Sequence, residues 1–191
     1  MNDYSQPEFY RFNEDSLKLV QRIKKCGVSA VSVLDLGAGC GVIGIETANH
    51  LGCEHLTLLE LQDDFYPHLE INLKHQLKTS LRSEIIKSSF GEWNPYRKYD
   101  LIVCNPPYYL PGRGQGNKDP RRELARSFVK DNWSTLMRLI ESTLAPEGRG
   151  YLVIKNDPLI LEEAKKNKGS LVVSASIENG LIYLEILSGI E

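Results

Sequence analysis

A carboxylate stands just before a run of alternating glycines near the start of the chain, in Asp35-Leu36-Gly37-Ala38-Gly39-Cys40-Gly41. Because a glycine has no Cβ and readily adopts a positive φ, the backbone of such a turn can touch a ligand directly. The carboxylate of Asp35 can hold an ammonium group or order the turn. We therefore expect Asp35, Gly37, Gly39 and Gly41 to line a ligand site. The alternative is a glycine-rich turn that binds nothing.

Glu60 and the segment Ser88-Ser89-Phe90 are the next candidates, because they follow apolar runs that predict buried strands. In an open α/β sheet, ligands bind outside the carboxyl ends of the strands. The two oxygens of Glu60 can accept from both hydroxyls of a ribose, a serine can bond the edge of an adenine, and Phe90 can stack on the ring. Gly39-Cys40-Gly41-Val42-Ile43-Gly44 also fits the dinucleotide fingerprint, so these residues leave S-adenosylmethionine (SAM) and NAD both open.

The most specific motif is Asn105-Pro106-Pro107-Tyr108, at the end of a later predicted strand. Its two acceptor oxygens suit the attack of an exocyclic NH₂ nitrogen on a methyl group. The lone pair of such a nitrogen is conjugated with the ring, and it must be turned out of the ring plane before it can attack. The Asn105 side-chain oxygen and the Pro106 carbonyl can each accept one N–H, and Tyr108 offers a flat face for stacking. We predict that Asn105, Pro106, Pro107 and Tyr108 are catalytic and that Asn105 also borders the cofactor. A rigid Asn-Pro turn without chemistry is the alternative.

Together, the glycine turn and the Asn105 motif resemble the class I SAM-dependent methyltransferases that modify planar nitrogens. Four further segments are similar to bacterial valine-tRNA adenine-N6-methyltransferases: Gln6-Pro7, Tyr10-Arg11-Phe12, Asp15-Ser16-Leu17 and Ala125-Arg126. The resemblance implies an N-methyltransferase with SAM as cofactor and an adenine N6 in tRNA as substrate. The chain departs from the family pattern at Ser127-Phe128, and at Ser88-Ser89, where many class I enzymes carry an acid.

Other functions stay open at this stage. Release-factor glutamine N5-methyltransferases share an NPPY turn, but the thirty residues before the first predicted strand leave no room for their usual helical N-terminal domain. An rRNA base N-methyltransferase and a catalytically silent SAM-binding scaffold are two more. A small NAD-binding oxidoreductase, from a different class, would use the glycines and Glu60 but leaves the Asn105 motif unexplained.

The charge distribution bears on an RNA substrate. The net charge is −2, whereas a protein that neutralises many phosphates usually has a basic excess. Six basic residues nevertheless fall between positions 106 and 130, against Asp119 and Glu123. We expect the substrate to be bound by Tyr108 and by the basic residues next to the motif, Arg113, Lys118, Arg121, Arg122 and Arg126. A solvated loop and helix face is the alternative reading of these charges.

The composition, 41% hydrophobic and 25% charged, is ordinary for a soluble globular protein. We expect one domain over residues 1–191, with a leader and a helix in residues 1–30. No apolar run approaches the roughly 20 residues that span a bilayer, and the polar first residues predict no signal peptide, so we expect a cytoplasmic protein.

The four cysteines lack CxxC pairing and the four histidines lack metal-ligand spacing, which predicts buried free thiols and no metal. The oligomeric state is not predicted.

The elements that would position these residues follow from hydrophobic periodicity. Helices are predicted at residues 13–26, 41–51, 63–78, 123–144 and 158–168. Strands are predicted at residues 31–34, 54–60, 83–88, 99–104, 151–154, 171–176 and 181–187, the last two joined across Asn179-Gly180, a strong hairpin signal. This order predicts an α/β fold with a Rossmann-like, doubly wound, seven-stranded sheet that is mostly parallel and ends in an antiparallel hairpin.

Overall fold

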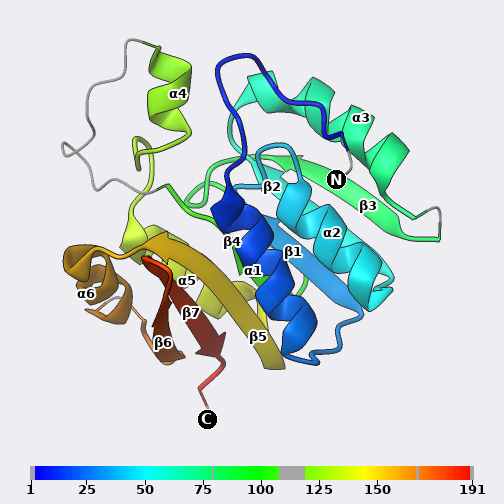
Figure 1. Cartoon of the computed structure of the whole chain (residues 1–191). Helices are drawn as coiled ribbons and strands as arrows, with labels where there is room; N and C mark the ends of the chain where they lie inside the picture. Colours follow the sequence, from blue (N-terminus) through cyan, green and yellow to red (C-terminus); the bar gives the residue numbers. More distant parts are fainter. Residues whose placement is uncertain (1–2, 79, 108–118, 167, 190–191) are drawn as a thin grey trace.

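The computed structural model describes residues 3–78, 80–107, 119–166 and 168–189, and shows a seven-stranded sheet between helices (Figure 1). The strands are β1 (Ser32–Leu36), β2 (His55–Glu60), β3 (Arg82–Lys87), β4 (Tyr99–Cys104), β5 (Leu144–Lys155), β6 (Val172–Glu178) and β7 (Leu181–Leu187). Their order is β3-β2-β1-β4-β5-β7-β6, and β7 runs antiparallel to both of its neighbours while the other pairs are parallel. The predicted fold class is confirmed.

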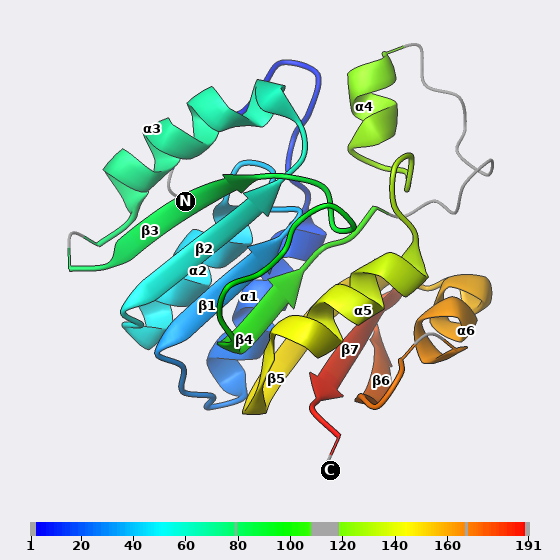
Figure 2. The same ribbon diagram turned by 180° about the vertical axis from the view of Figure 1, so that it is seen from behind.

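Two layers of helices cover the sheet. One layer holds α1 (Glu14–Lys25), α2 (Val42–Leu51), the 3₁₀ turn η1 (Asp63–Phe65) and α3 (Tyr66–Gln76). The opposite layer holds α5 (Trp133–Thr143) and α6 (Pro158–Lys166), with α5 in front in Figure 2. The short α4 (Pro120–Leu124) lies beyond the carboxyl ends of the central strands (Figure 2).

The central strands are buried on both faces, as a parallel sheet between two helical layers requires. Every residue of β1 is buried, and the apolar Val33 and Leu34 are fully so. On α1, Leu19, Val20 and Ile23 recur at helical spacing and are buried in the core on the face of the sheet that carries α1, α2 and α3. Val33 of β1 belongs to the core on one face of the sheet and Leu34 to the core on the other, so the strand that leads into the glycine turn is enclosed on both faces.

The terminal hairpin turns where the sequence indicates. Asn179 has φ 51° and Gly180 has φ 74°, the left-handed backbone that a two-residue type I′ turn needs at both positions. Asparagine and glycine tolerate that conformation better than other residues do. The turn pairs β6 with β7 and completes the antiparallel edge of the sheet.

The prediction of a single helix over residues 123–144 is wrong. The structure has two helices there, because α4 ends at Leu124 and α5 begins only at Trp133. Asn132 caps α5, its side-chain oxygen accepting the N–H of Thr135 at 2.9 Å. The connecting residues include Ser127 and Phe128, which are buried, so tertiary packing overrides the helical pattern. The strand predicted at 151–154 is likewise longer, spanning all of β5.

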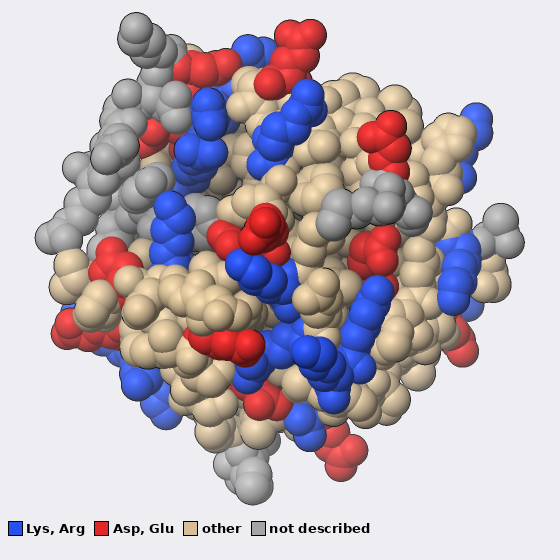
Figure 3. Space-filling model, viewed as in Figure 1, with Lys and Arg blue, Asp and Glu red and all other residues tan. Residues whose placement is uncertain are grey.

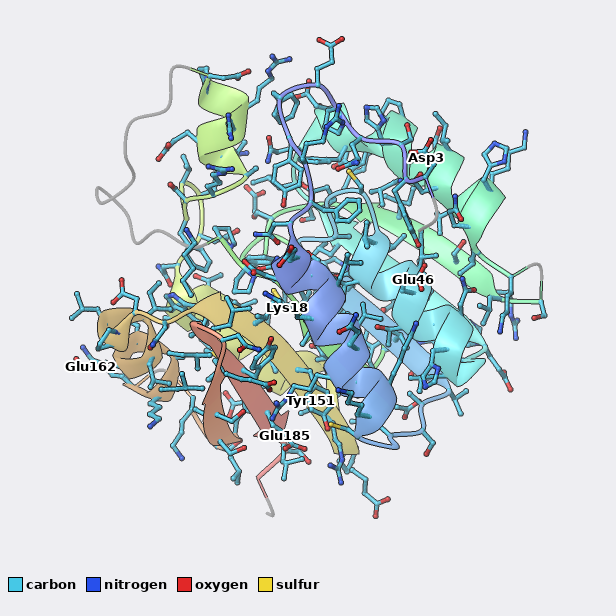
Figure 4. All side chains as sticks on the ribbon, viewed as in Figure 1. Asp3, Lys18, Glu46, Tyr151, Glu162 and Glu185 are labelled. Carbon is cyan, nitrogen blue, oxygen red and sulfur yellow. The ribbon has the colours of Figure 1, made fainter. Side chains whose placement is uncertain are left out.

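The N-terminal segment is tied to the helices of the first layer. The Tyr4 hydroxyl donates to Oε1 of Glu46 on α2 at 3.1 Å (Glu46 is labelled in Figure 4). On α3, the Asn72 side chain accepts the backbone N–H of Ser5 at 2.8 Å and donates to the Ser5 carbonyl at 2.9 Å. These contacts fix the path of the chain toward Tyr10, which reaches the site described below.

Within the described ranges, no helix has the length and apolar character that crossing a bilayer requires. The same ranges hold no group of three or more His, Cys, Asp or Glu side chains placed to bind a metal ion. Cys26, Cys40, Cys53 and Cys104 are free thiols; the expectation that such thiols are buried holds for the last three and is wrong for Cys26, which is exposed just after α1.

Candidate functional site

The candidate site lies at the carboxyl edge of the sheet, where β1 and β4 are neighbours. Leu36, the last residue of β1, pairs with Cys104, the last residue of β4. Gly37 and Asn105 therefore leave the sheet side by side, at the point where the strand order changes direction. Both predicted motifs meet at this edge, although 68 positions separate Gly37 from Asn105.

The glycine turn needs glycine for two reasons. Gly37, Gly39 and Gly41 have φ of 68°, 54° and 80°, a left-handed backbone that L side chains rarely adopt. A Cβ at Gly41 would also lie 2.9 Å from Cδ2 of Leu69. The turn is anchored to the neighbouring strand, because the N–H groups of Gly37 and Ala38 both donate to the Leu59 carbonyl at 2.9 Å.

Asp35 is buried at the end of β1, with 1% of its surface exposed. Its Oδ2 accepts the N–H of Gly44 at 2.8 Å, while Oδ1 has no hydrogen-bond partner among the described residues. Burial raises the pKa of Asp35 to about 7, and the nearby Glu60 acts in the same direction. A buried carboxylate oxygen without a partner is costly unless something donates to it, so Asp35 is suited to receive a ligand's ammonium group.

Glu60 is tied into the backbone around it. Its Oε2 accepts the N–H of Gly39 at 2.8 Å, and its Oε1 accepts those of Leu61 at 2.9 Å and Gln62 at 2.8 Å. Burial raises its pKa, and these three hydrogen bonds oppose that rise. Because a carboxylate has roughly four acceptor positions, about one remains, on Oε2, for a ligand hydroxyl.

An open cavity lies beside Glu60, and its space of about 640 Å³ includes the solvent at its mouth. Seven of the predicted site residues line it: Gly37, Gly39, Glu60, Ser88, Ser89, Phe90 and Pro107. Asp35, Gly41, Asn105 and Pro106 are not among its lining residues, although Asn105 is only two positions from Pro107.

The cavity is also lined by two residues that the sequence analysis did not assign, Tyr10 and Asp131. Tyr10 lines the cavity from the N-terminal segment and packs edge-on against Phe65, with ring centroids 5.3 Å apart. Asp131 accepts the N–H groups of Phe90 and Gly91 at 2.9 and 3.0 Å, and so fixes the loop that carries the Phe90 ring. For Tyr10, the only signal in the sequence is the family resemblance at Tyr10-Arg11-Phe12. For Asp131, no local pattern in the sequence indicates a role at the site.

Asn105 is half-buried, and its Nδ2 donates a hydrogen bond to the Ser16 hydroxyl oxygen at 3.1 Å. Its carbonyl oxygen, Oδ1, is buried and has no partner in the described part of the chain. Pro106 is buried as well, and Pro107 is half-buried. The last predicted catalytic residue, Tyr108, lies outside the described residues, as do Arg113 and Lys118.

The remaining predicted basic residues differ in their surroundings. Arg121 pairs with Asp119 at 2.9 Å and with Asp64 at 3.6 Å, and its guanidinium carbon lies 4.6 Å from the centroid of the Phe9 ring. It therefore braces α4 against the N-terminal segment and η1. Arg122 is exposed, whereas Arg126 is half-buried. In Figure 3, basic side chains over α4 have acidic side chains beside them.

Comparison with known proteins agrees with this geometry. The family model described as methyltransferase small domain matches residues 11–158. The tRNA1(Val) (adenine(37)-N6)-methyltransferase of Glaesserella parasuis serovar 5 is 30% identical over 129 residues, which cover 68% of this chain and 53% of that protein. The protein of the same name from Shewanella halifaxensis is 30% identical over 168 residues, covering 84% and 67% respectively. The chain thus spans about half to two thirds of these relatives' lengths.

A solved structure shares the fold. The T. thermophilus 16S rRNA N2 G1207 methyltransferase, determined with AdoMet and guanosine, superposes with a TM-score of 0.68 at 20% identity, covering 93% of this chain and 44% of that one. The segment that the family model matches begins at Arg11 and ends at Pro158, so it contains the glycine turn, Glu60 and the Asn105 motif. This chain belongs to the methyltransferase small domain family.

Proposed function

We propose that this chain is a SAM-dependent N-methyltransferase that methylates an exocyclic amino nitrogen, most directly N6 of an adenine in tRNA. The observation that carries the proposal is the buried Oδ1 of Asn105, which has no hydrogen-bond partner among the described residues, at the edge where β4 meets the glycine turn. An acceptor in that position is what an incoming amine, a hydrogen-bond donor, requires.

The residues present fit SAM. Oδ1 of Asp35 is a buried acceptor that no described residue donates to, and it is suited to the amino group of a methionine moiety. Glu60 retains an acceptor position for a ribose hydroxyl, and Phe90 lines the same cavity, where its ring could stack on an adenine. The predicted ligand positions at Ser88 and Ser89 line the same cavity. When bound, SAM would supply an electrophilic methyl group on sulfur.

The chain's own contribution is alignment rather than acid–base chemistry. Oδ1 of Asn105 and the carbonyl of Pro106 would each accept one N–H of the substrate amine, turning its lone pair out of the ring plane. The proline pair holds the backbone of Pro106 in one conformation, so its carbonyl direction is fixed in advance. No strong base is needed, because the methylated, cationic amine loses its proton readily. Such preorganised contacts are the main source of rate in this scheme.

A tRNA substrate is supported by the names of the two relatives described above, which methylate adenine 37 of a valine tRNA. It is also supported by the exposed Arg122 and the half-buried Arg126, whose sequence neighbours Leu124, Ala125 and Ser127 line the cavity. An adenine in a tRNA loop must be splayed out of its stack to reach Asn105. A protein that does this would work in the cytoplasm. The family match argues against the oxidoreductase alternative.

The substrate class is tested by incubating the protein with methyl-labelled SAM and, in competition, unmodified tRNA, an rRNA fragment and a Gly-Gly-Gln peptide. The proposal predicts label in tRNA. Label in the peptide alone would identify a glutamine methyltransferase, and label in rRNA alone an rRNA enzyme, and either result contradicts the tRNA assignment. Thermal shifts with SAM, with its demethylated product and with NAD give an independent check, since only the first two should stabilise the protein.

A further inference from the structure

Ser16 is a buried serine that the proposed chemistry has not yet used. It lies in the first turn of α1, with 5% of its surface exposed, and its hydroxyl oxygen accepts the Nδ2 hydrogen of Asn105 at 3.1 Å. This contact joins residues 89 positions apart, one from the N-terminal helix and one from the end of β4. Ser16 belongs to the Asp15-Ser16-Leu17 segment that carried part of the family resemblance without a role.

The two ends of the Asn105 amide have opposite hydrogen-bonding character. The NH₂ end only donates and the carbonyl end only accepts. A substrate amine is itself a donor, so it is received by the carbonyl oxygen and repelled by the NH₂ group. The NH₂ end is engaged by Ser16, and the carbonyl oxygen is the end that has no partner among the described residues.

We propose that Ser16 is a positioning residue, which holds the NH₂ group of Asn105 so that Oδ1 stays available to the substrate amine. This inference rests on the proposed function, because only an amine substrate gives the orientation of the amide its importance. Ser16 would not touch substrate or cofactor itself.

The surroundings of Ser16 make it a firm support. The next turns of α1 bury Leu19, Val20 and Ile23, which are 0 to 3% exposed. The helix packs on α2 and on β5, so its first turn has a fixed position relative to the sheet. A support on a packed helix positions a side chain more accurately than one on a loop does.

The contact can be tested without any activity measurement, by following the side-chain NH₂ signals of Asn105 in a ¹H–¹⁵N spectrum. These signals are identified as the pair that disappears in Asn105→Asp. We expect Ser16→Ala to shift them and Ser16→Thr, which keeps a hydroxyl, to leave them close to their original position. Unchanged signals in Ser16→Ala would overturn the proposal.

The consequence is tested by kinetics with the same variants. Ser16→Ala should lower kcat by about 10- to 100-fold while the SAM dissociation constant stays within about twofold, because a misplaced group affects the aligned complex rather than cofactor binding. Ser16→Thr should restore most of kcat. Ser32→Ala is the matched control, since Ser32 is a buried serine whose hydroxyl bonds Asp100 at 2.9 Å at the opposite end of β1, and it should leave kcat unchanged.

The two tests separate the failure of the inference from the failure of the proposed function. Wild-type activity with an unaltered kcat in Ser16→Ala overturns the positioning role and leaves the proposed function standing. A wild-type protein that methylates no amine rejects the proposed function, and with it the role of Ser16 in that reaction, even where the spectra show the contact. A kcat loss in Ser16→Ala that Ser16→Thr reverses supports both.

Discussion

The N–H of Gly39 donates to Oε2 of Glu60 at 2.8 Å, which links the glycine turn after β1 to the end of β2. Glu60 accepts two more backbone hydrogens, from Leu61 and Gln62, with its other oxygen. The acid at the end of β2 is therefore part of the frame of the pocket as well as a ligand for it. A change at Glu60 should show in folding stability and in cofactor affinity together.

Replacing Glu60 by alanine should weaken SAM binding by about 1–3 kcal/mol, through loss of a charge-assisted contact to the ribose and loosening of the turn. The same change should lower the free energy of unfolding, because three backbone N–H groups lose their acceptor. Calorimetry with SAM and urea unfolding measure the two effects. Glu70→Ala, at an exposed position on α3, is the control. Unchanged SAM affinity in Glu60→Ala would remove Glu60 from the cofactor site.

Asp35 should make the stability of the free protein depend on pH. Its pKa rises from 3.8 to about 7 on folding, so between these values the folded state holds a proton that the unfolded state has lost. The stabilisation that the folded protein gains from holding this proton on Asp35 is fully present below pH 3.8 and is lost as the pH rises through about 7. Asp35→Asn should therefore be more stable relative to wild type at pH 8 than at pH 5. Urea unfolding at both pH values checks this, and parallel curves for the two proteins would contradict it.

Gly41→Ala tests the close packing of the glycine turn. Its positive φ adds strain of about 1–2 kcal/mol for an L residue. The new Cβ would in addition lie 2.9 Å from the Leu69 side chain. Gly52 is a matched control, since it also has a positive φ, 64°, but a Cβ there meets nothing within 4 Å. We expect Gly41→Ala to lose more unfolding free energy than Gly52→Ala, and equal losses would show that the Leu69 contact has no energetic weight.

The two adjacent arginines on α4 should behave differently toward RNA. Arg122→Ala should weaken tRNA binding and reduce the salt slope by about 0.7–0.9, the value of one phosphate contact. Arg121→Ala should change the slope little, because its guanidinium is engaged by Asp64, Asp119 and the ring of Phe9. Binding isotherms at several salt concentrations measure both. A slope that falls as much in Arg121→Ala as in Arg122→Ala would place Arg121 on the RNA.

The sequence predicts those parts of the site that lie within one short segment of the chain. The glycine turn, Glu60 and Asn105 all follow apolar runs, and the ends of parallel strands must meet at one edge, so their proximity could be foreseen. The partners of these residues could not. Ser16 and Asp131 act through contacts 89 and 41 positions away, and no local pattern marks such pairs. The break between α4 and α5 was also missed, because the burial of Phe128 and the cap at Asn132 outweigh helical periodicity.

The central claim is that Asn105 aligns an adenine amine for methylation, and nucleoside analysis of treated tRNA tests it most directly. Unmodified tRNA is incubated with SAM and either the wild-type protein or Asn105→Ala, then digested, and its nucleosides are measured by mass spectrometry. We predict N6-methyladenosine with the wild type, and turnover about 100-fold lower with Asn105→Ala at nearly equal SAM affinity, a loss of about 3 kcal/mol of transition-state stabilisation. Methylation at another atom, or equal turnover by the two proteins, would contradict the claim.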